Sequence, residues 1–287
     1  MADSTTEKIN QLKKHLRIQV SRFCSENKAS WKYPILQTLY EIRSKNWPAV
    51  IFGGTVRSLM LGTGTHRRPR DIDIVLSSVS VDNIKELFSD SFVRKTRFGG
   101  VKLQRNDMDF DIWPIDKTWA YVNDDSKART YGNLPKTTFL NIEAIAIDIW
   151  PKAEGQKRTI YSDDDSFFKA IISETLEINR EENPFPNLCV VRSLIMAAKT
   201  RFKLGPRLSE YIEKYGFAIS PQELEEVQIK HYGKVKVQGN TLLEWIDYIK
   251  NERKINQPIS LPISYKQLKL WRDIDQQLNP KVHLYYD

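Results

Sequence analysis

The spacing of apolar residues changes twice along the chain and separates three regions. Near the N-terminus, Ile9, Leu12 and Leu16 recur at helical spacing, and a second such stretch follows Pro34, which predicts two helices over 5–45. Short apolar runs then predict strands, and helical spacing returns in the C-terminal part of the chain. The predicted helices there span 163–173, 185–202, 206–215, 221–231, 240–252 and 264–278.

The central region combines short strands with two helices. An apolar run over 49–52 ends at Gly53 and Gly54, and Gly62 closes the helix that follows. The dipeptide Asn106–Asp107 separates two apolar runs, as in the turn of a β-hairpin. The predicted elements are strands at 49–52, 71–76, 101–105 and 108–115, helices at 55–61 and 80–90, and either a strand or a short helix plus strand at 140–149.

These elements predict the fold class and the division into domains. The chain has 287 residues, enough for one large domain or two ordinary ones. We predict an α+β fold in which N-terminal helices (1–45) pack on a small mixed sheet with helices (46–160). A helical C-terminal domain (161–287) follows.

The composition of the chain indicates its cellular compartment and the chemical class of its partners. The net charge of +8 favours polyanions such as RNA or nucleotides as partners. No apolar run reaches the roughly 18 residues of a membrane span, and the polar N-terminus predicts no secretory signal. The only two cysteines, Cys24 and Cys189, lie far apart, which fits a reducing cytoplasm and offers no zinc spacing.

Two pairs of aspartates are the first candidate site. Asp71 and Asp73 are two residues apart in a predicted strand, so both point to one face, and Asp109 and Asp111 repeat the arrangement in a second strand. Clustered carboxylates repel one another unless a cation lies between them, and hard oxygen ligands suit Mg²⁺. The simpler interpretation is a solvent-exposed strand face.

The glycine pair between the predicted strand 49–52 and the predicted helix 55–61 is a candidate phosphate site. Gly53 and Gly54 stand between a strand and a helix, where glycine lets the backbone approach an anionic ligand closely. A plain tight turn is the alternative interpretation. A phosphate-binding turn and a metal-binding acid pair would belong to one unit of the fold.

The stretches 53-GGTVRSLMLG-62 and 70-RDIDIVL-76 resemble a known motif in order, spacing and flanking residues. The motif is the Gly-Gly-x-Val-Arg-Asp and Asp-x-Asp head of tRNA CCA-adding enzymes and bacterial poly(A) polymerases, members of the DNA polymerase β-like nucleotidyltransferase superfamily. The stretch 183-NPFPNLCVVRSLIMAAKTRFKLGPRLSEYI-212 resembles that family's neck segment. The resemblance implies a polymerase β-like head followed by a helical neck and substrate-binding domain.

The resemblance also implies roles for particular residues. Asp71 and Asp73 would hold two Mg²⁺ ions, and Asp111 would complete the site, with Asp109 as the alternative third acid. The residues implied in nucleotide binding are Gly53, Gly54, Thr55, Arg57 and Arg192. Apart from the resemblance, the cation Lys199 near a predicted helix end is a further candidate for nucleotide binding. Arg57 instead holds its helix to the core in the interpretation we prefer. Lys199 has a second explanation too, because a cation near a helix end offsets the helix dipole.

The implied reaction is nucleotidyl transfer from a nucleoside triphosphate to an acceptor hydroxyl, with release of pyrophosphate. RNA, in particular a tRNA 3′ end, is the expected acceptor. The alternatives are nucleotidylation of a protein or a small molecule, or an inactive nucleotide-binding module. The chain departs from the family at Ser58, Glu143 and Cys189, where the family motifs have aspartate, asparagine and arginine. These departures predict a divergent, compact member without assured CCA specificity.

Overall fold

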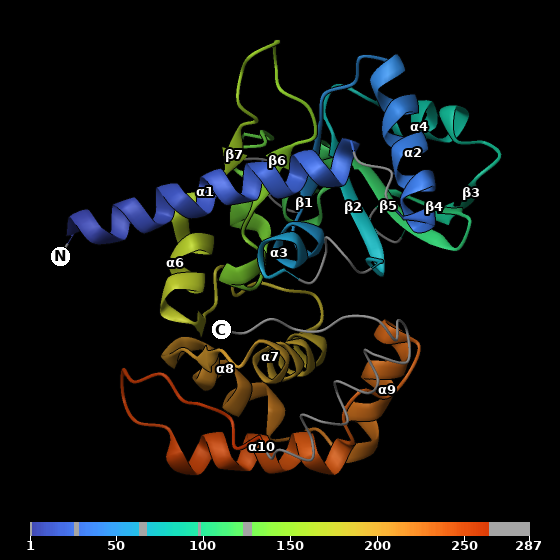
Figure 1. Cartoon of the computed structure of the whole chain (residues 1–287). Coiled ribbons are helices and arrows are strands. Elements are labelled where there is room, and N and C mark those ends of the chain that lie inside the picture. Colours follow the sequence, from blue (N-terminus) through green and yellow to red (C-terminus); the bar gives the residue numbers. More distant parts are fainter. Residues whose placement is uncertain (1, 26–28, 63–67, 97–98, 123–127, 264–287) are drawn as a thin grey trace. The chain divides into compact units, whose positions relative to one another are not determined.

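The computed structural model describes residues 2–25, 29–62, 68–96, 99–122 and 128–263, and divides the chain into two compact units (Figure 1). Unit 1 comprises Met1–Thr138 and Ile142–Lys169, and unit 2 comprises Phe139–Asn141 and Ala170–Asp287. Unit 1 is an α+β unit and unit 2 is mainly helical, so the predicted fold class is confirmed. The predicted helix at 264–278 lies outside the described residues.

Unit 1 is built, in its described residues, on a seven-stranded mixed sheet with the strand order β3-β4-β5-β2-β1-β6-β7. Within this sheet β2 and β5 pair in parallel, and the other neighbouring strands pair antiparallel. The strands are β1 (Ala49–Phe52), β2 (Asp71–Leu76), β3 (Phe92–Lys95), β4 (Val101–Arg105), β5 (Met108–Pro114), β6 (Ala146–Asp148) and β7 (Ile160–Tyr161).

Helices pack on one side of this sheet (Figure 1): α1 (Ala2–Ser25), α2 (Tyr33–Ser44), α3 (Gly54–Met60) and α4 (Val81–Leu87). Helix α3 packs on β1 and β2, and α4 packs on β4 and β5. In strands β2 and β5, every second residue is fully buried, including Ile72, Ile74, Phe110 and Ile112. This alternation leaves the aspartates of both strands on the opposite face.

The opposite face of the sheet is covered in part by the chain that follows β5. This segment contains η2 (Ile115–Lys117), α5 (Trp119–Val122) and η3 (Leu134–Thr137). A small core forms there from six buried residues: Val50, Val75, Ile115, Tyr121, Leu134 and Ala146. Partly buried aromatic residues border this small core. The aspartates lie on the same face, beyond this border.

The structure also settles several details of the elements. Asn106 and Asp107 have φ angles of 44° and 62°, as a type I′ hairpin turn requires, so the predicted hairpin is confirmed. The ambiguous stretch at 140–149 is a short helix, η4 (Asn141–Glu143), followed by strand β6. The edge strand β3 escaped prediction because all four of its residues are exposed, so it carries no alternation of burial.

Unit 2 consists mainly of helices α7 (Pro186–Thr200), α8 (Pro206–Gly216), α9 (Pro221–Tyr232) and α10 (Gly239–Glu252). Helix α6 (Ser166–Ser173) runs across the boundary between the units, and β8 (Thr175–Leu176) pairs with β9 (Lys203–Leu204). Ser220 and Glu223 form the capping box expected at the start of α9.

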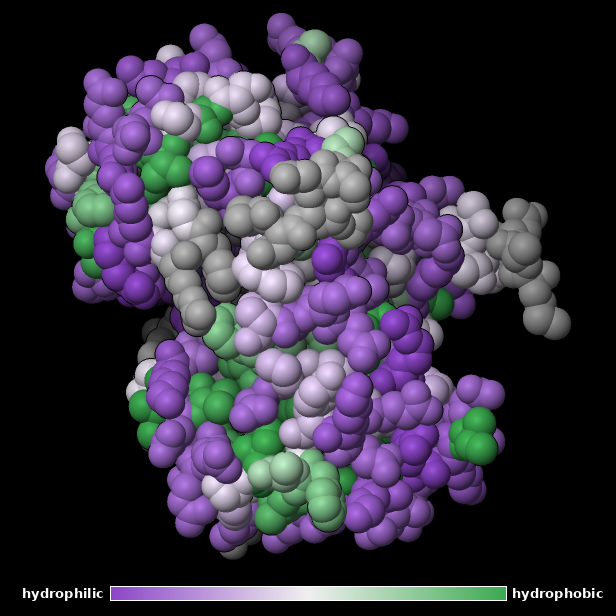
Figure 2. Space-filling view, turned by 180° about the vertical axis from the view of Figure 1, so that it is seen from behind, coloured by the Kyte–Doolittle hydropathy of each residue, from purple (hydrophilic) through white to green (hydrophobic). Residues whose placement is uncertain are grey.

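The outer surface shows how polar residues are distributed over the two units. Hydrophilic residues cover most of the face shown in Figure 2. Within the described ranges, none of the helices is both long enough and apolar enough to span a membrane.

Candidate nucleotidyl-transfer site

Two hydrogen bonds fix the glycine turn after β1, one to the residue before β6 and one to the first residue of β2. Gly53 has a φ of +58°, a conformation that side-chain-bearing residues rarely adopt, and its N–H donates to the carbonyl of Ile145 at 3.0 Å. The buried hydroxyl of Thr55 donates to the carbonyl of Asp71 at 3.3 Å. The turn is therefore held beside the first residue of the acidic strand β2.

The parallel pairing of β2 and β5 brings the four aspartates together. Asp71 lies opposite Asp109 and Asp73 lies opposite Asp111, one pair following the other along the strands. All four are half-buried and share the face that carries the small core. The predicted gathering of carboxylates on one face is thus present in the fold, across strands that are 32 residues or more apart in sequence.

Asp109 and Asp111 differ in their partners, although the sequence pattern treats them alike. The Lys102 Nζ lies 2.7 Å from Asp109 Oδ2, and the Gln104 side-chain amide donates to Asp109 Oδ1 at 3.1 Å. The described residues include no ion-pair partner within 4 Å for Asp111. Burial raises the pKa of Asp111, and the charges of Asp71 and Asp109 add to this, while Lys102 opposes it. Asp111 is therefore the better candidate for the third acid.

Asp73 lies at the centre of the negative charge. Burial raises the pKa of its carboxyl well above 3.8, and the charges of Asp71, Asp111 and Glu143 raise it further, with Arg70 opposing them. A divalent cation relieves such repulsion, and carboxylate oxygens are the ligands that Mg²⁺ prefers, so the donor set fits this ion. Among the described residues, no three acidic, histidine or cysteine side chains form a ready-made metal cluster.

Arg70 neutralises the first aspartate of the strand. Its Nη2 and Nε donate to Asp71 Oδ2 at 2.7 and 3.1 Å, and the side chains of Arg70 and Asp71 are 53% and 26% exposed. A cation bound to Asp71 has to compete with this guanidinium. Arg70 therefore opposes metal binding at the site where the acidic pair favours it.

Replacing Arg70 with alanine is expected to tighten the binding of Mn²⁺ to the protein about two- to fivefold, because a partly exposed ion pair contributes about 1 kcal/mol or less. Titration calorimetry measures the affinity. Arg94→Ala, which removes an exposed arginine from the edge strand β3, serves as the matched control. An unchanged or weaker affinity in Arg70→Ala would show that the guanidinium does not compete with the ion.

Arg57 has an acidic partner within the protein. Its Nη1 lies 2.5 Å from Glu143 Oε1, and the two side chains are only 17% and 10% exposed. The pair joins α3 to η4, and the hydrogen bond from Gly53, directly before α3, to Ile145, two residues after η4, connects the adjoining residues. This geometry supports the structural role of Arg57, which clamps the glycine turn in place.

Arg192 and Lys199 lie in the other unit. Both are on α7, in which Arg192 is half-buried and Lys199 is exposed in the last turn. The carboxylates and the glycine turn belong to unit 1. The contribution of these two residues to nucleotide binding stays a prediction.

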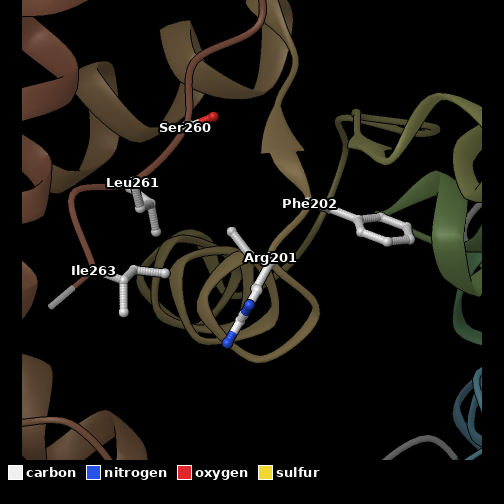
Figure 3. Close-up of a pocket in the computed structure, with 6 residues that line it drawn as sticks. Arg201, Phe202, Ser260, Leu261 and Ile263 are labelled. Atoms are coloured by element: carbon white, nitrogen blue, oxygen red, sulfur yellow. The ribbon is translucent and has the colours of Figure 1, made fainter. Parts of the chain in front are cut away.

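A pocket of about 280 Å³ lies at the C-terminal end of α7 in unit 2. It is lined by Ala197, Arg201, Phe202, Ser260, Leu261 and Ile263. Figure 3 shows the Phe202 ring pointing away from Leu261 and Ile263, so the side chains do not converge on one point. The acidic residues of unit 1 contribute nothing to its lining.

Sequence reasoning missed three charged residues around the acids. Glu143 was recognised only as a departure from a family motif, although a glutamate within an apolar run signals a buried cation partner. Lys102 alternates with apolar residues in β4, but its pairing with Asp109 depends on the hairpin register and was not predicted. Arg70 directly precedes Asp71, and nothing in the pattern shows which way its side chain turns.

Solved structures of CCA-adding and tRNA-processing enzymes share this fold. A CCA-adding enzyme in complex with CTP aligns with a TM-score of 0.56 and 16% identity, over 81% of this chain and 55% of that chain. The Thermotoga maritima CCA-adding enzyme in complex with tRNA aligns with a TM-score of 0.54 and 16% identity, over 80% and 54%. An apo tRNA-processing enzyme aligns with a TM-score of 0.54 and 15% identity, over 78% and 58%.

This likeness establishes the fold of the chain. The chain spans little more than half the length of the solved structures that it matches. No protein-family profile and no curated protein matches it.

Proposed function

With the fold of CCA-adding enzymes as the premise, we propose that this protein is a nucleotidyltransferase. It transfers a nucleoside monophosphate from a nucleoside triphosphate to an acceptor hydroxyl and releases pyrophosphate. One observation carries the proposal: the pairing of β2 with β5 gathers Asp71, Asp73 and Asp111 on one face, beside a glycine turn. Three of the solved structures with this fold are complexes with ATP, CTP and tRNA.

In unit 1, one group of residues binds the triphosphate and another binds the metal ions. Gly53, Gly54 and Thr55 present backbone close to the acidic strand and bind the triphosphate. Asp71, Asp73 and Asp111 would hold two Mg²⁺ ions. Bound there, the ions would supply stabilisation of the negative charge that develops during displacement at the α-phosphate.

Asp111 lies at the attacking hydroxyl. Its carboxylate lies opposite Asp73 across the β2–β5 pair and accepts the proton that the hydroxyl loses. Asp109 is paired with Lys102 and Gln104, so it does not serve as the third acid. Arg57 keeps the glycine turn in register through Glu143.

The acceptor is RNA, in particular a tRNA 3′ end. The net charge of +8 favours a polyanion, and one solved structure with this fold holds tRNA. The helical region 161–287 contributes to RNA binding, and Arg192 and Lys199 of unit 2 remain the candidate nucleotide-binding residues of that region. The protein acts in the cytoplasm, the reducing setting that fits its two cysteines, Cys24 and Cys189, which lie far apart in sequence.

A labelling screen tests the function and identifies the acceptor. Purified protein is incubated with Mg²⁺, each α-labelled nucleoside triphosphate and total RNA, and in a parallel reaction with a cell lysate. We expect label on RNA with the wild type and none with Asp71→Asn. Label on a protein and not on RNA would show that the acceptor is a protein side chain. No label on any acceptor would leave a nucleotide-binding module as the remaining interpretation.

The choice of third acid is tested by a matched pair of variants. Asp111→Asn is expected to lower kcat about a hundredfold or more, because it removes the proton acceptor and a metal ligand. Asp109→Asn, the same change two residues earlier on the same strand face, is expected to keep kcat within a few-fold of the wild type. Single-turnover transfer measures both rates. The opposite ranking would assign the third acid to Asp109.

A further inference from the structure

Two aromatic side chains lie on the same sheet face as the acids. Phe52, the last residue of β1, and Trp113 of β5 pack edge to face, with ring centroids 6.2 Å apart and an interplanar angle of 75°. Both are partly buried, and both border the small core on this face. We call Phe52 and Trp113 the aromatic step.

Strand register places the aromatic step next to the site. Trp113 lies opposite Val75, and Val50, two residues before Phe52, lies opposite the same valine. Trp113 follows Asp111 by two residues on the same face, a separation of about 6.6 Å along a strand. Phe52 directly precedes Gly53. The step therefore joins the strand of the third acid to the strand that ends in the glycine turn.

Trp113 is held in a fixed orientation by its polar atom. Its indole Nε1 donates to the buried hydroxyl of Thr118 at 3.1 Å, which satisfies the one hydrogen-bonding group of the ring. The side chain packs against the small core, and the residue as a whole is only partly buried. What Trp113 offers to a ligand is therefore ring surface rather than a hydrogen bond.

We propose that the aromatic step is the subsite for the terminal nucleobase of the acceptor, which stacks on Trp113 while its ribose hydroxyl lies at Asp111. The inference rests on the proposed function, because that function places the attacking hydroxyl at Asp111. A ring two residues beyond this acid is suited to stack on the base of the nucleoside whose ribose carries the attacking hydroxyl. Stacking accepts every base, so the subsite selects a nucleoside at the acceptor end without selecting its sequence.

The first test compares two RNA acceptors that differ only at the 3′-terminal nucleoside, which is intact in one and abasic in the other. Trp113→Leu is expected to raise KM for the intact acceptor about tenfold, the effect of losing one base–aromatic stack, and to leave KM for the abasic acceptor and for the nucleoside triphosphate unchanged. Trp113→Phe keeps a ring and is expected to retain most of the preference. Trp119→Leu, the same change six residues later in α5, is the matched control.

The second test needs no catalysis. An RNA ending in 2-aminopurine is expected to lose fluorescence on binding the wild type and Trp113→Phe, and to keep it on binding Trp113→Leu. Thermal melting of each variant shows that it is folded. Quenching in the wild type without nucleotidyl transfer would contradict the proposed function and support the subsite. Transfer without quenching, or an equal KM change for both acceptors in Trp113→Leu, would overturn the subsite.

Discussion

Replacing Asp73 with asparagine is expected to lower nucleotidyl transfer about a thousandfold or more and, in the absence of divalent ions, to stabilise the folded protein. Activity falls because the metal ions lose a central ligand, and ion stabilisation of the transition state contributes several kcal/mol. Stability rises because the substitution removes a half-buried negative charge that burial, Asp71 and Asp111 disfavour.

The pH dependence of stability follows from the direction of the shift. The pKa of Asp73 is higher in the folded protein than its ordinary value of 3.8, so folding favours the protonated form. This contribution to stability is fully present below pH 3.8 and is lost as the pH rises through the folded-state pKa. The stability advantage of Asp73→Asn is therefore expected at neutral pH and disappears below about pH 4.

Thermal melting of the wild type and Asp73→Asn across this pH range, with and without Mg²⁺, measures both effects. Magnesium is expected to stabilise the wild type more than the variant, because only the wild type presents the complete acid set. A variant that is less stable than the wild type at neutral pH without metal would show that Asp73 makes a structural contact that outweighs the repulsion.

Replacing Glu143 with leucine is expected to destabilise unit 1 by about 3–5 kcal/mol, because Arg57 is left as a buried charge without its acidic partner. Urea denaturation measures the loss. The double variant Arg57→Met/Glu143→Leu is expected to recover most of it, since apolar residues of similar size often replace a buried ion pair at little cost.

The exposed pair Glu226–Lys230 on α9 is the matched control for this experiment. Its side chains are 63% and 78% exposed, so Glu226→Leu is expected to change stability by about 0.5 kcal/mol or less. Equal losses in Glu143→Leu and in the double variant would mean that packing of the Glu143 side chain, rather than its charge, stabilises the glycine turn.

Local patterns were enough to predict most elements of the fold. Helical spacing predicted α1 and α2, and the Asn106–Asp107 turn fixed the β4–β5 hairpin. The same patterns were silent on pairing between distant strands, because the parallel contact of β2 with β5 joins segments separated by a helix and two other strands. Strand β3 has no buried face, so no periodicity marks it.

The acidic residues of the candidate site could be predicted from the sequence, but the side chains that pair with them could not. Alternation alone places Asp71 and Asp73 on one face, and the glycine turn is legible as a break between strand and helix. The distinction between Asp109 and Asp111 depends on where Lys102 reaches, which is a property of side-chain geometry. The pair Arg57–Glu143 spans 86 residues, so no local pattern could assign it.

One double-label measurement tests the central claim most directly. The protein is incubated with Mg²⁺, RNA and a nucleoside triphosphate labelled at the α-phosphate in one reaction and at the γ-phosphate in another. We predict that α-label appears in RNA and γ-label in pyrophosphate at the same rate, and that Asp71→Asn abolishes both. Transfer that persists in Asp71→Asn, or release of the γ-label as inorganic phosphate, would contradict nucleotidyl transfer at the β2–β5 carboxylates.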